Sequence, residues 1–392
     1  MFRPARLPNI SRRAFLASTL VAAPALSRAG TQATDDLDDF VRQEMSKANI
    51  PGLALGIAKA GAVQVARGYG LADLEHRRPV TANTVFHIAS VTKLVTATML
   101  VKLLHEKRSV LDEPIGKYLD FAVVNPHAAA TPITFRHLLT HTSSISDAKY
   151  YEIDFRSPGA DATLELADLL KNYLRPGGRY YSADGCFLKA APGAAWDYSN
   201  IGYGLLGHLA SRIGGTDMRE LTREQIFAPL GMGHTYWSIA ETPAAESAVP
   251  YDVADGKLIA TQPVGFPDWS AGMLRSSVGD LAKFVAACAN GGVASGNRIL
   301  PAAAQAEMFT SRTSAQLPDW LTGQALGWMA SNLDGAPGLN PIFNHWGGDP
   351  GVFTAVYAEP GTRTGVVIFT NVTASSASKA AIKSIAAKIL RN

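Results

Sequence analysis

Strand-like patterns near both ends of this 392-residue chain enclose a long, mostly helical region, and this arrangement strongly limits its possible folds. Apolar and small residues alternate over 53–65 around Ala60-Gly61, which predicts a β-hairpin. A second hairpin is predicted over 354–370, with its turn at 359–362. From residue 91 to about 214 the patterns are helical. We therefore predict an α+β fold, an α/β/α sandwich whose antiparallel sheet is built from both chain ends and flanked by helices.

The same patterns predict how the chain is divided. Residues 30–88 together with 265–392 are expected to form the sheet domain, and 89–264 an inserted, mostly helical domain, with the active site at their junction. The glycine- and proline-rich segment 158–195 is predicted to be a surface excursion near a binding cleft. Helices are predicted over 35–49, 91–107, 133–140, 164–174, 201–213 and 375–390.

Residues 1–29 have the character of an export signal. Arg12-Arg13 precede a short apolar run and small residues, with cleavage expected after Ala25 or Ala29, which resembles a twin-arginine signal. The segment holds five arginines and no acid, so the remainder has 36 − 5 = 31 basic against 33 acidic residues, a net charge of −2. We expect a periplasmic or secreted protein without a membrane span in its mature form, and no nucleic-acid partner.

Ser90 and Lys93 stand at the start of a strongly apolar run, which predicts that they share one face of a buried helix near its N-terminus. The free N–H groups and partial positive charge of a helix N-terminus suit an oxyanion. A lysine in low dielectric can take a proton from a serine hydroxyl. The pair alone is a weak signal, because an N-capping serine before a lysine with a solvated ammonium has the same spacing.

Two later segments, Tyr198-Ser199-Asn200 and His345-Trp346-Gly347, complete an ordered set with the Ser-Lys pair. The order S-x-x-K, Y-x-N, H-x-G resembles the serine β-lactamase and penicillin-binding-protein superfamily. The likeness is to its class C-like branch of β-lactamases, DD-peptidases, D-aminopeptidases and esterases. It extends over nearly all of the chain beyond the export signal and implies a β-lactamase/transpeptidase-like fold. Segments similar to the framework of that branch are 134–143, 229–232, 270–277 and 280–281.

The resemblance implies roles for four of these residues. Ser90 would be the nucleophile that forms an acyl-enzyme, and Lys93 and Tyr198 would share its proton. Which of the two is the general base stays open, because a coupled pair titrates as a unit. Asn200 would hydrogen-bond Lys93 and the acyl-side amide of the substrate.

The third motif would form the edge strand of the cleft. The resemblance implies that His345, Trp346 and Gly347 line the substrate site and that the Gly348 N–H joins that of Ser90 in an oxyanion hole. β-Lactamases have lysine and threonine in place of His345-Trp346, which give them a fixed cation and a hydroxyl for the antibiotic's carboxylate. A partly charged histidine and a bulky tryptophan favour substrates with apolar or aromatic groups over penicillins.

The sequence thus predicts a secreted serine hydrolase that cleaves small esters or amides, with esterase activity favoured. A DD-carboxypeptidase, a D-aminopeptidase or a class C-type β-lactamase with the same nucleophile is the alternative. A penicillin-binding sensor that is acylated without turnover is an alternative of another class. The small-molecule substrate itself and the oligomeric state stay open.

No cofactor or metal is expected. His137 and His141 have the i, i+4 spacing of zinc ligands, but Leu138 stands where H-E-x-x-H requires glutamate, so both are interpreted as structural. The chain has no G-x-S-x-G elbow, which disfavours an α/β-hydrolase, and no phosphate-binding fingerprint. Cys186 and Cys288 could pair in an oxidising compartment, and the sequence leaves this open.

Overall fold

The computed structural model describes residues 26–310, 313, 315–333 and 342–391. It divides into two units, residues 1–41 and 42–392, and helix α1 (Leu26–Lys47) begins in the first and ends in the second. The predicted export signal falls mainly on residues 1–25, which lie outside the described ones. In the part of the chain that the structure describes, no helix is both long and apolar enough to cross a membrane.

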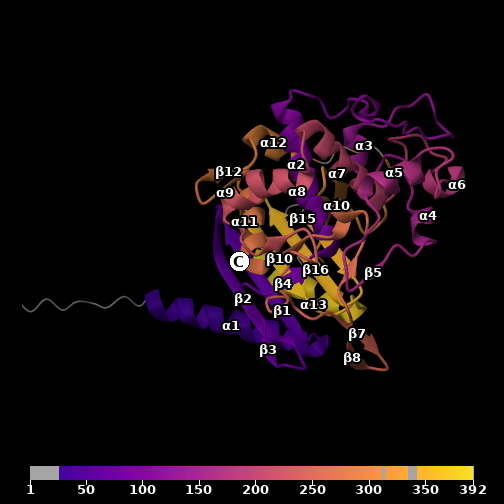
Figure 1. The fold of residues 1–392 in the computed structure, drawn as a ribbon. Coiled ribbons are helices and arrows are strands. Elements are labelled where there is room, and N and C mark those ends of the chain that lie inside the picture. The colour runs from indigo at the N-terminus through magenta and orange to yellow at the C-terminus, as the bar shows by residue number, and fades with distance from the viewer. Residues whose placement is uncertain (1–25, 311–312, 314, 334–341, 392) are drawn as a thin grey trace, which may run out of the picture. The chain divides into compact units, whose positions relative to one another are not determined.

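The central sheet of residues 42–392 joins the two predicted hairpins, as expected (Figure 1). β1 pairs with β2 in one hairpin and β16 with β17 in the other, and β1 and β17 then pair antiparallel from Leu53↔Thr370 to Lys59↔Thr364. The sheet order is β13 (Gly323–Gln324), β14 (Met329–Ser331), β15 (Ile342–Asp349), β16 (Val352–Glu359), β17 (Thr364–Thr370), β1 (Gly52–Lys59), β2 (Ala62–Asp73) and β3 (Arg78–Pro79).

Helices cover the sheet, which confirms the α+β sandwich. α11 (Val278–Ala289) packs on β17, β1 and β2, and α13 (Ser376–Leu390) packs on β16 and β17. Every residue of β17 is buried, as expected of a strand covered on both faces. Gly56 of β1 lets α11 approach, because a Cβ there would lie 3.0 Å from the Cβ of Ala282. The predicted closing helix is confirmed, although Ala380, predicted to face inward, is exposed.

The helices predicted over 91–107, 133–140, 164–174 and 201–213 are confirmed, and loops separate them. α2 (Thr92–Glu106) packs against α7 (Asn200–Gly214) and α10 (Trp269–Gly272). The two-domain division of residues 30–392 stays a prediction. The other helices are α3 (Phe135–Leu139), α4 (Ala148–Tyr151), α5 (Leu166–Leu174), α6 (Ala183–Cys186), α8 (Met218–Thr222), α9 (Ala228–Leu230) and α12 (Ala302–Met308), with 3-10 turns η1 (Ala89–Val91) and η2 (Ile115–Tyr118) and a π-turn η3 (Arg223–Phe227).

Short sheets support the edge of the helical region. One joins β4, β10 and β6, so that the strand just before Ser90 is tied to residues 275–277. Cys186 and Cys288 are both free and buried, which answers the question of their pairing. The strands of these sheets are β4 (Val85–His87), β10 (Arg275–Ser277), β6 (Thr235–Tyr236), β5 (Ser157–Pro158), β9 (Val264–Gly265), β7 (Tyr251–Ala254), β8 (Lys257–Ala260), β11 (Val293–Ala294) and β12 (Asn297–Arg298).

Candidate active site

Ser90 lies in the tight turn η1, directly before helix α2. Its neighbour Ala89 has φ of 46°, a left-handed conformation that is strained for a residue with a Cβ. The turn lies against β15 because Gly347 has no side chain: a Cβ there would be 2.4 Å from Ile88 O. Gly347 therefore sets how closely the strand approaches the serine turn, whereas a Cβ at the neighbouring Gly348 would make only ordinary contacts, at 3.9 Å from Phe353 Cδ2 and 4.0 Å from Ala374 Cβ.

Lys93, the second residue of α2, is completely buried. Its ammonium donates three hydrogen bonds, to Asn200 Oδ1 at 2.7 Å, to Ala271 O at 2.8 Å and to Ser90 Oγ at 3.2 Å. An ammonium has three donors and no acceptor, so these three partners satisfy it fully. The sequence prediction that Lys93 and Ser90 share one face at the start of the helix is confirmed by this contact.

Burial lowers the pKa of Lys93 to about 8, against the opposing charges of Asp268 and Asp147. A neutral amine keeps two donors and gains one lone pair. Of the three partners, the two carbonyl oxygens can only accept, whereas the Ser90 hydroxyl can turn and donate. Once Lys93 is neutral, its lone pair therefore faces the Ser90 proton.

Tyr198 completes the group around Lys93. Its ring centroid lies 4.8 Å from Lys93 Nζ and 4.4 Å from the ring of His141, on which it stacks. Burial raises the pKa of Tyr198 well above its usual value, and the smaller effect of the Ser90 side chain opposes this rise. The phenol is therefore protonated at neutral pH and can act as a donor and a relay.

Asn200 is held at the first turn of α7 by a buried carboxylate that sequence reasoning missed. Asp147 accepts hydrogen bonds from Ser199 Oγ at 2.7 Å, Asn200 N at 2.5 Å and Ile201 N at 3.2 Å. A carboxylate at a helix N-terminus satisfies free N–H groups and is favoured by the helix dipole. Tyr151 Oη accepts from Asn200 Nδ2 at 2.8 Å, which turns the amide oxygen toward Lys93.

His345 is buried and neutral. Burial, with a smaller contribution from the Lys93 charge, lowers the pKa of His345 to about 3. Its Nδ1 lies 2.9 Å from Trp346 O, an obligate acceptor, so the proton is assigned to Nδ1. The other nitrogen, Nε2, is buried without a partner among the described residues. The sequence predicted a partly charged histidine here; the structure instead gives a neutral imidazole, because no solvent reaches the ring.

Trp346 points to the other face of β15. Lys383 of α13 lies 5.3 Å from its ring centroid, and Trp320 stacks on it at 6.3 Å. Successive side chains of a strand alternate between faces, so the inward position of His345 turns Trp346 away from Ser90. Its predicted role in substrate binding stays a proposal, and its ring does not line the cavity beside Ser90.

That cavity has a volume of about 330 Å³. Among the described residues that line it none is a lysine, arginine or histidine, whereas Asp268 and Asp349 contribute two carboxyl groups. The predicted excursion 158–195 contributes no lining residue, because α4 and the segment 266–272 form that wall. The excursion begins beside this wall, where Ser157–Pro158 pair with Val264–Gly265. The cavity is lined by Ser90, Tyr150, Tyr151, Tyr198, Asn200, Phe266, Asp268, Gly272, Gly348 and Asp349.

Burial governs the two carboxyl groups. It raises the pKa of Asp268, which accepts from Tyr150 Oη at 2.6 Å, and raises the pKa of Asp349 to about 7.

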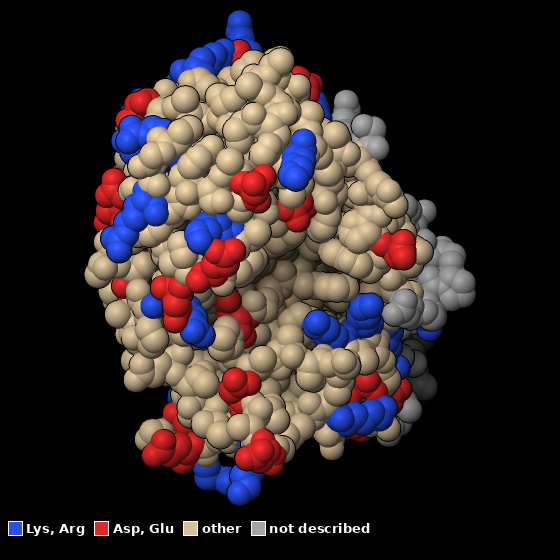
Figure 2. All heavy atoms as spheres, turned by 90° about the vertical axis from the view of Figure 1, so that its right-hand side faces the viewer, with Lys and Arg blue, Asp and Glu red and all other residues tan. Residues whose placement is uncertain are grey.

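On the face shown in Figure 2, basic and acidic side chains are interspersed around a hollow lined mainly by other residues. A continuous basic surface of the kind that binds nucleic acid is not seen on this face.

The two histidines with zinc-like spacing serve local contacts. His137 Nδ1 accepts from Thr134 N at 3.3 Å, as part of the cap of α3, and His141 Nδ1 accepts from Ser199 N at 3.1 Å. Within the described ranges no group of three or more His, Cys, Asp or Glu side chains could hold a metal ion. His141 stacks on Tyr198 and accepts the hydrogen bond from Ser199 N, so it positions the Tyr198 segment. The spacing of the two histidines did not indicate this role.

Comparisons with known proteins agree with this geometry. A family model described as Beta-lactamase matches residues 37–389. An unguisins hydrolase from Aspergillus violaceofuscus is 28% identical over 370 residues, which cover 87% of this chain and 62% of that protein. The chain therefore spans less than two thirds of that relative's length.

Two solved structures share the fold. A penicillin-binding protein homologue from Pyrococcus abyssi is 26% identical with a TM-score of 0.72, covering 91% of this chain and 77% of that one. D-amino acid amidase from Ochrobactrum anthropi SV3 is 24% identical with a TM-score of 0.72, covering 91% and 97%. The predicted β-lactamase/transpeptidase-like fold is thus confirmed. Because the family model matches most of its length, this chain belongs to the Beta-lactamase family of serine hydrolases.

Proposed function

We propose that this protein is an exported serine hydrolase that cleaves small neutral esters or amides through an acyl-Ser90 intermediate. One observation carries the proposal: the buried Lys93 makes three hydrogen bonds, and Ser90 is the only partner that can give it a proton. A lysine with a pKa of about 8 is poised to act as general base near neutral pH.

The reaction follows from these contacts. Neutral Lys93 takes the Ser90 proton as Oγ bonds to the substrate carbonyl carbon, and the developing oxyanion faces the backbone N–H groups of Ser90 and Gly348. When the bond to the leaving group breaks, the proton passes to that group through the Tyr198 hydroxyl. Water then attacks the acyl carbon, Lys93 and Tyr198 move its proton to Ser90 Oγ, and the acid leaves.

The charge of the cavity favours neutral acyl substrates over carboxylate-bearing β-lactams. His345, at the position of a fixed cation in β-lactamases, is neutral. The described lining instead contains the carboxyl groups of Asp268 and Asp349. A substrate carboxylate would meet no counter-charge among the described residues that line this cavity.

A second candidate is an amidase or aminopeptidase acting on amino-acid amides. Asp349 and Asp268 could pair with an α-ammonium group of the substrate. A D-amino acid amidase is among the proteins that share this fold, which supports this candidate. This candidate uses the same nucleophile and differs only in the charge of the acyl part.

The test compares p-nitrophenyl butyrate, D-phenylalanine amide and nitrocefin as substrates of the full chain and of Ser90→Ala. Ser384→Ala, in helix α13, is the matched control. We expect the ester to be hydrolysed best and nitrocefin at least about 100-fold more slowly, a difference of about 2.7 kcal/mol in transition-state binding. Ser90→Ala should be inactive, whereas its melting temperature should equal that of Ser384→Ala.

Other outcomes decide between the alternatives. Faster turnover of the amide than of the ester would favour the second candidate. Equal rates for Ser90→Ala and Ser384→Ala would refute the nucleophile. A stoichiometric, long-lived β-lactam adduct on Ser90 without turnover of any substrate would identify a penicillin-binding sensor.

Export is part of the proposal and rests on residues 1–29. Changing Arg12-Arg13 to Lys-Lys should hold the protein in the cytoplasm if the twin-arginine route is used. Fractionation of the expressing cells measures this. Undiminished export of the double variant would contradict that route.

A further inference from the structure

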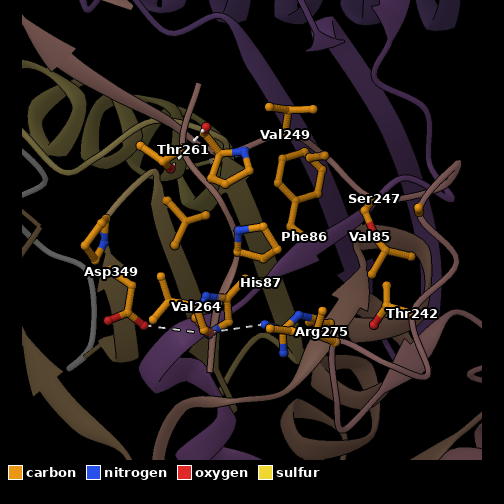
Figure 3. A pocket seen from close by; sticks show the side chains of 17 residues that line it. Val85, Phe86, His87, Thr242, Ser247, Val249, Thr261, Val264, Arg275 and Asp349 are labelled. Carbon is orange, nitrogen blue, oxygen red and sulfur yellow. Dashed lines mark hydrogen bonds and ion pairs between the residues drawn. The ribbon is translucent and has the colours of Figure 1, made fainter. Parts of the chain in front are cut away.

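A second cavity, of about 280 Å³, lies between β4, β10 and the segment 239–264 (Figure 3). Its walls are mainly apolar, with Phe86 of β4 and Val249 and Val264 of that segment pointing into it. Asp349 lines both this cavity and the one beside Ser90. The two spaces are therefore neighbours that share one wall residue.

One side of the second cavity is polar. His87 lies between Asp349 and Arg275 along this side (Figure 3). His87 Nε2 is 2.7 Å from Gly272 O and 3.6 Å from Asp349 Oδ2. Burial, with a smaller contribution from the Arg275 charge, lowers the pKa of His87 to about 3, so the ring is neutral.

Arg275 is the positively charged residue among those that line the second cavity. The residue is 4% exposed, and burial lowers the pKa of Arg275 to about 10, which leaves the guanidinium charged at neutral pH. Its Nη1 donates to Met273 O at 2.9 Å and its Nη2 makes a long contact of 3.4 Å with Val264 O. Among the described residues no carboxylate lies within ion-pair distance of it.

Such a cation is costly to bury. A guanidinium has five N–H donors, and carbonyl oxygens occupy only two of its nitrogens here. Taking a charge out of water is repaid only when an opposite charge and good hydrogen bonds replace the solvent. Asp161 and Asp349 lie beyond ion-pair distance and only partly offset the effect of burial on the pKa of Arg275. Burial also raises the pKa of Asp349 to about 7.

We propose that this cavity binds a small carboxylate with an apolar body, its carboxylate on Arg275 and its body against Phe86, Val249 and Val264. Guanidinium and carboxylate match in geometry and form paired hydrogen bonds. The apolar walls favour a short chain or a single ring, because the volume lies at the lower end of small-molecule pockets. The site extends the proposed function without depending on it.

Calorimetry on the full-length Ser90→Ala protein tests this with phenylacetate as the probe, in a zwitterionic buffer without added chloride. Phenylacetamide, equal in shape but neutral, is the matched ligand. We expect phenylacetate to bind at least about 10-fold more tightly than the amide, since a charged pair in a buried site is worth more than a neutral one. Because this variant lacks the nucleophile, failure of the hydrolase proposal would not affect the result.

Two variants place the ligand. Arg275→Met removes the charge and Val249→Trp fills the space without touching Arg275, and each should weaken phenylacetate binding at least about 10-fold. Arg298→Met is the control, since Arg298 also bonds only to backbone carbonyls but is exposed. If Arg275→Met does not fold, phenylacetate binding by Val249→Trp alone tests the proposal. Absence of phenylacetate binding, equal binding of the amide, or full binding by Val249→Trp would overturn the proposal.

The carboxylate could belong to a separate acid or to the far end of an ester held at Ser90. Turnover of mono-p-nitrophenyl adipate and of p-nitrophenyl hexanoate, by protein with Ser90 intact, separates these sources. A selective loss of the adipate ester's kcat/KM in Val249→Trp identifies the substrate's own end. If Val249→Trp abolishes phenylacetate binding but changes the kcat/KM of neither ester selectively, the carboxylate belongs to a separate acid.

Discussion

Replacing Gly347 by alanine should separate β15 from the turn that holds Ser90. The new Cβ would lie 2.4 Å from Ile88 O and 2.5 Å from Thr354 Oγ1. Ile88 O cannot move alone, because it accepts hydrogen bonds from Thr354 Oγ1 at 2.8 Å and from Val91 N at 3.2 Å. Carbon–oxygen contacts normally begin at about 3.3 Å, so strand and turn must part by about 1 Å.

That displacement changes the site more than the fold. A shift of about 1 Å between reacting groups costs on the order of 100-fold in rate, and overpacking of this size costs about 1–3 kcal/mol of folding stability. We expect Gly347→Ala to lower kcat for p-nitrophenyl butyrate about 100-fold while the protein stays folded at 25 °C. The kcat is measured at saturating ester and the free energy of unfolding by urea titration.

Gly233→Ala is the matched control, because a Cβ at Gly233 would meet nothing within 4 Å. It should change neither kcat nor the unfolding free energy beyond about 0.5 kcal/mol. A folded Gly347→Ala protein that keeps more than a third of the wild-type kcat would show that close approach of β15 does not set the geometry at Ser90.

Three further predictions concern the groups around Lys93. Because Lys93 acts when neutral and its pKa is about 8, log kcat/KM should rise with unit slope as pH increases to about 8 and then level; a flat profile between pH 6 and 9 would contradict this. Tyr198→Phe should lower kcat by about 100-fold or more with an unchanged melting temperature, since only the proton relay is lost; steady-state kinetics beside a thermal melt check this. Asp147→Asn faces an amide N–H₂ toward backbone donors of α7, so urea titration should show about 1–3 kcal/mol less stability, and unchanged stability would refute the cap at Asn200.

Some elements were predictable because their signal is local. The hairpin 53–65 alternates with period two, and the hairpin 354–370 shows as two largely apolar runs around the turn 359–362. Their pairing follows from the need to bury both. α11 gave no such signal, since ten of its 12 residues are buried and the helix has no polar face. β13 and β14 are two and three residues long, too short for any period to show.

The site divides in the same way. The three ordered motifs were enough to single out Ser90, Lys93, Tyr198 and Asn200, and their mutual contacts agree with that choice. Asp147 was missed, because an isolated aspartate in a loop carries no sign that it will cap a helix 53 residues later.

The sequence by itself determined the sheet from both ends, the helical middle and the order of the three motifs. Only the tertiary structure decided that His345 is neutral, that Trp346 faces α13 and that Arg275 is buried beside an apolar cavity. Periodicity and motifs are properties of neighbouring residues. The charge state of a side chain depends on whether segments far away in the sequence exclude water from it. Its direction depends on which of those segments pack beside it.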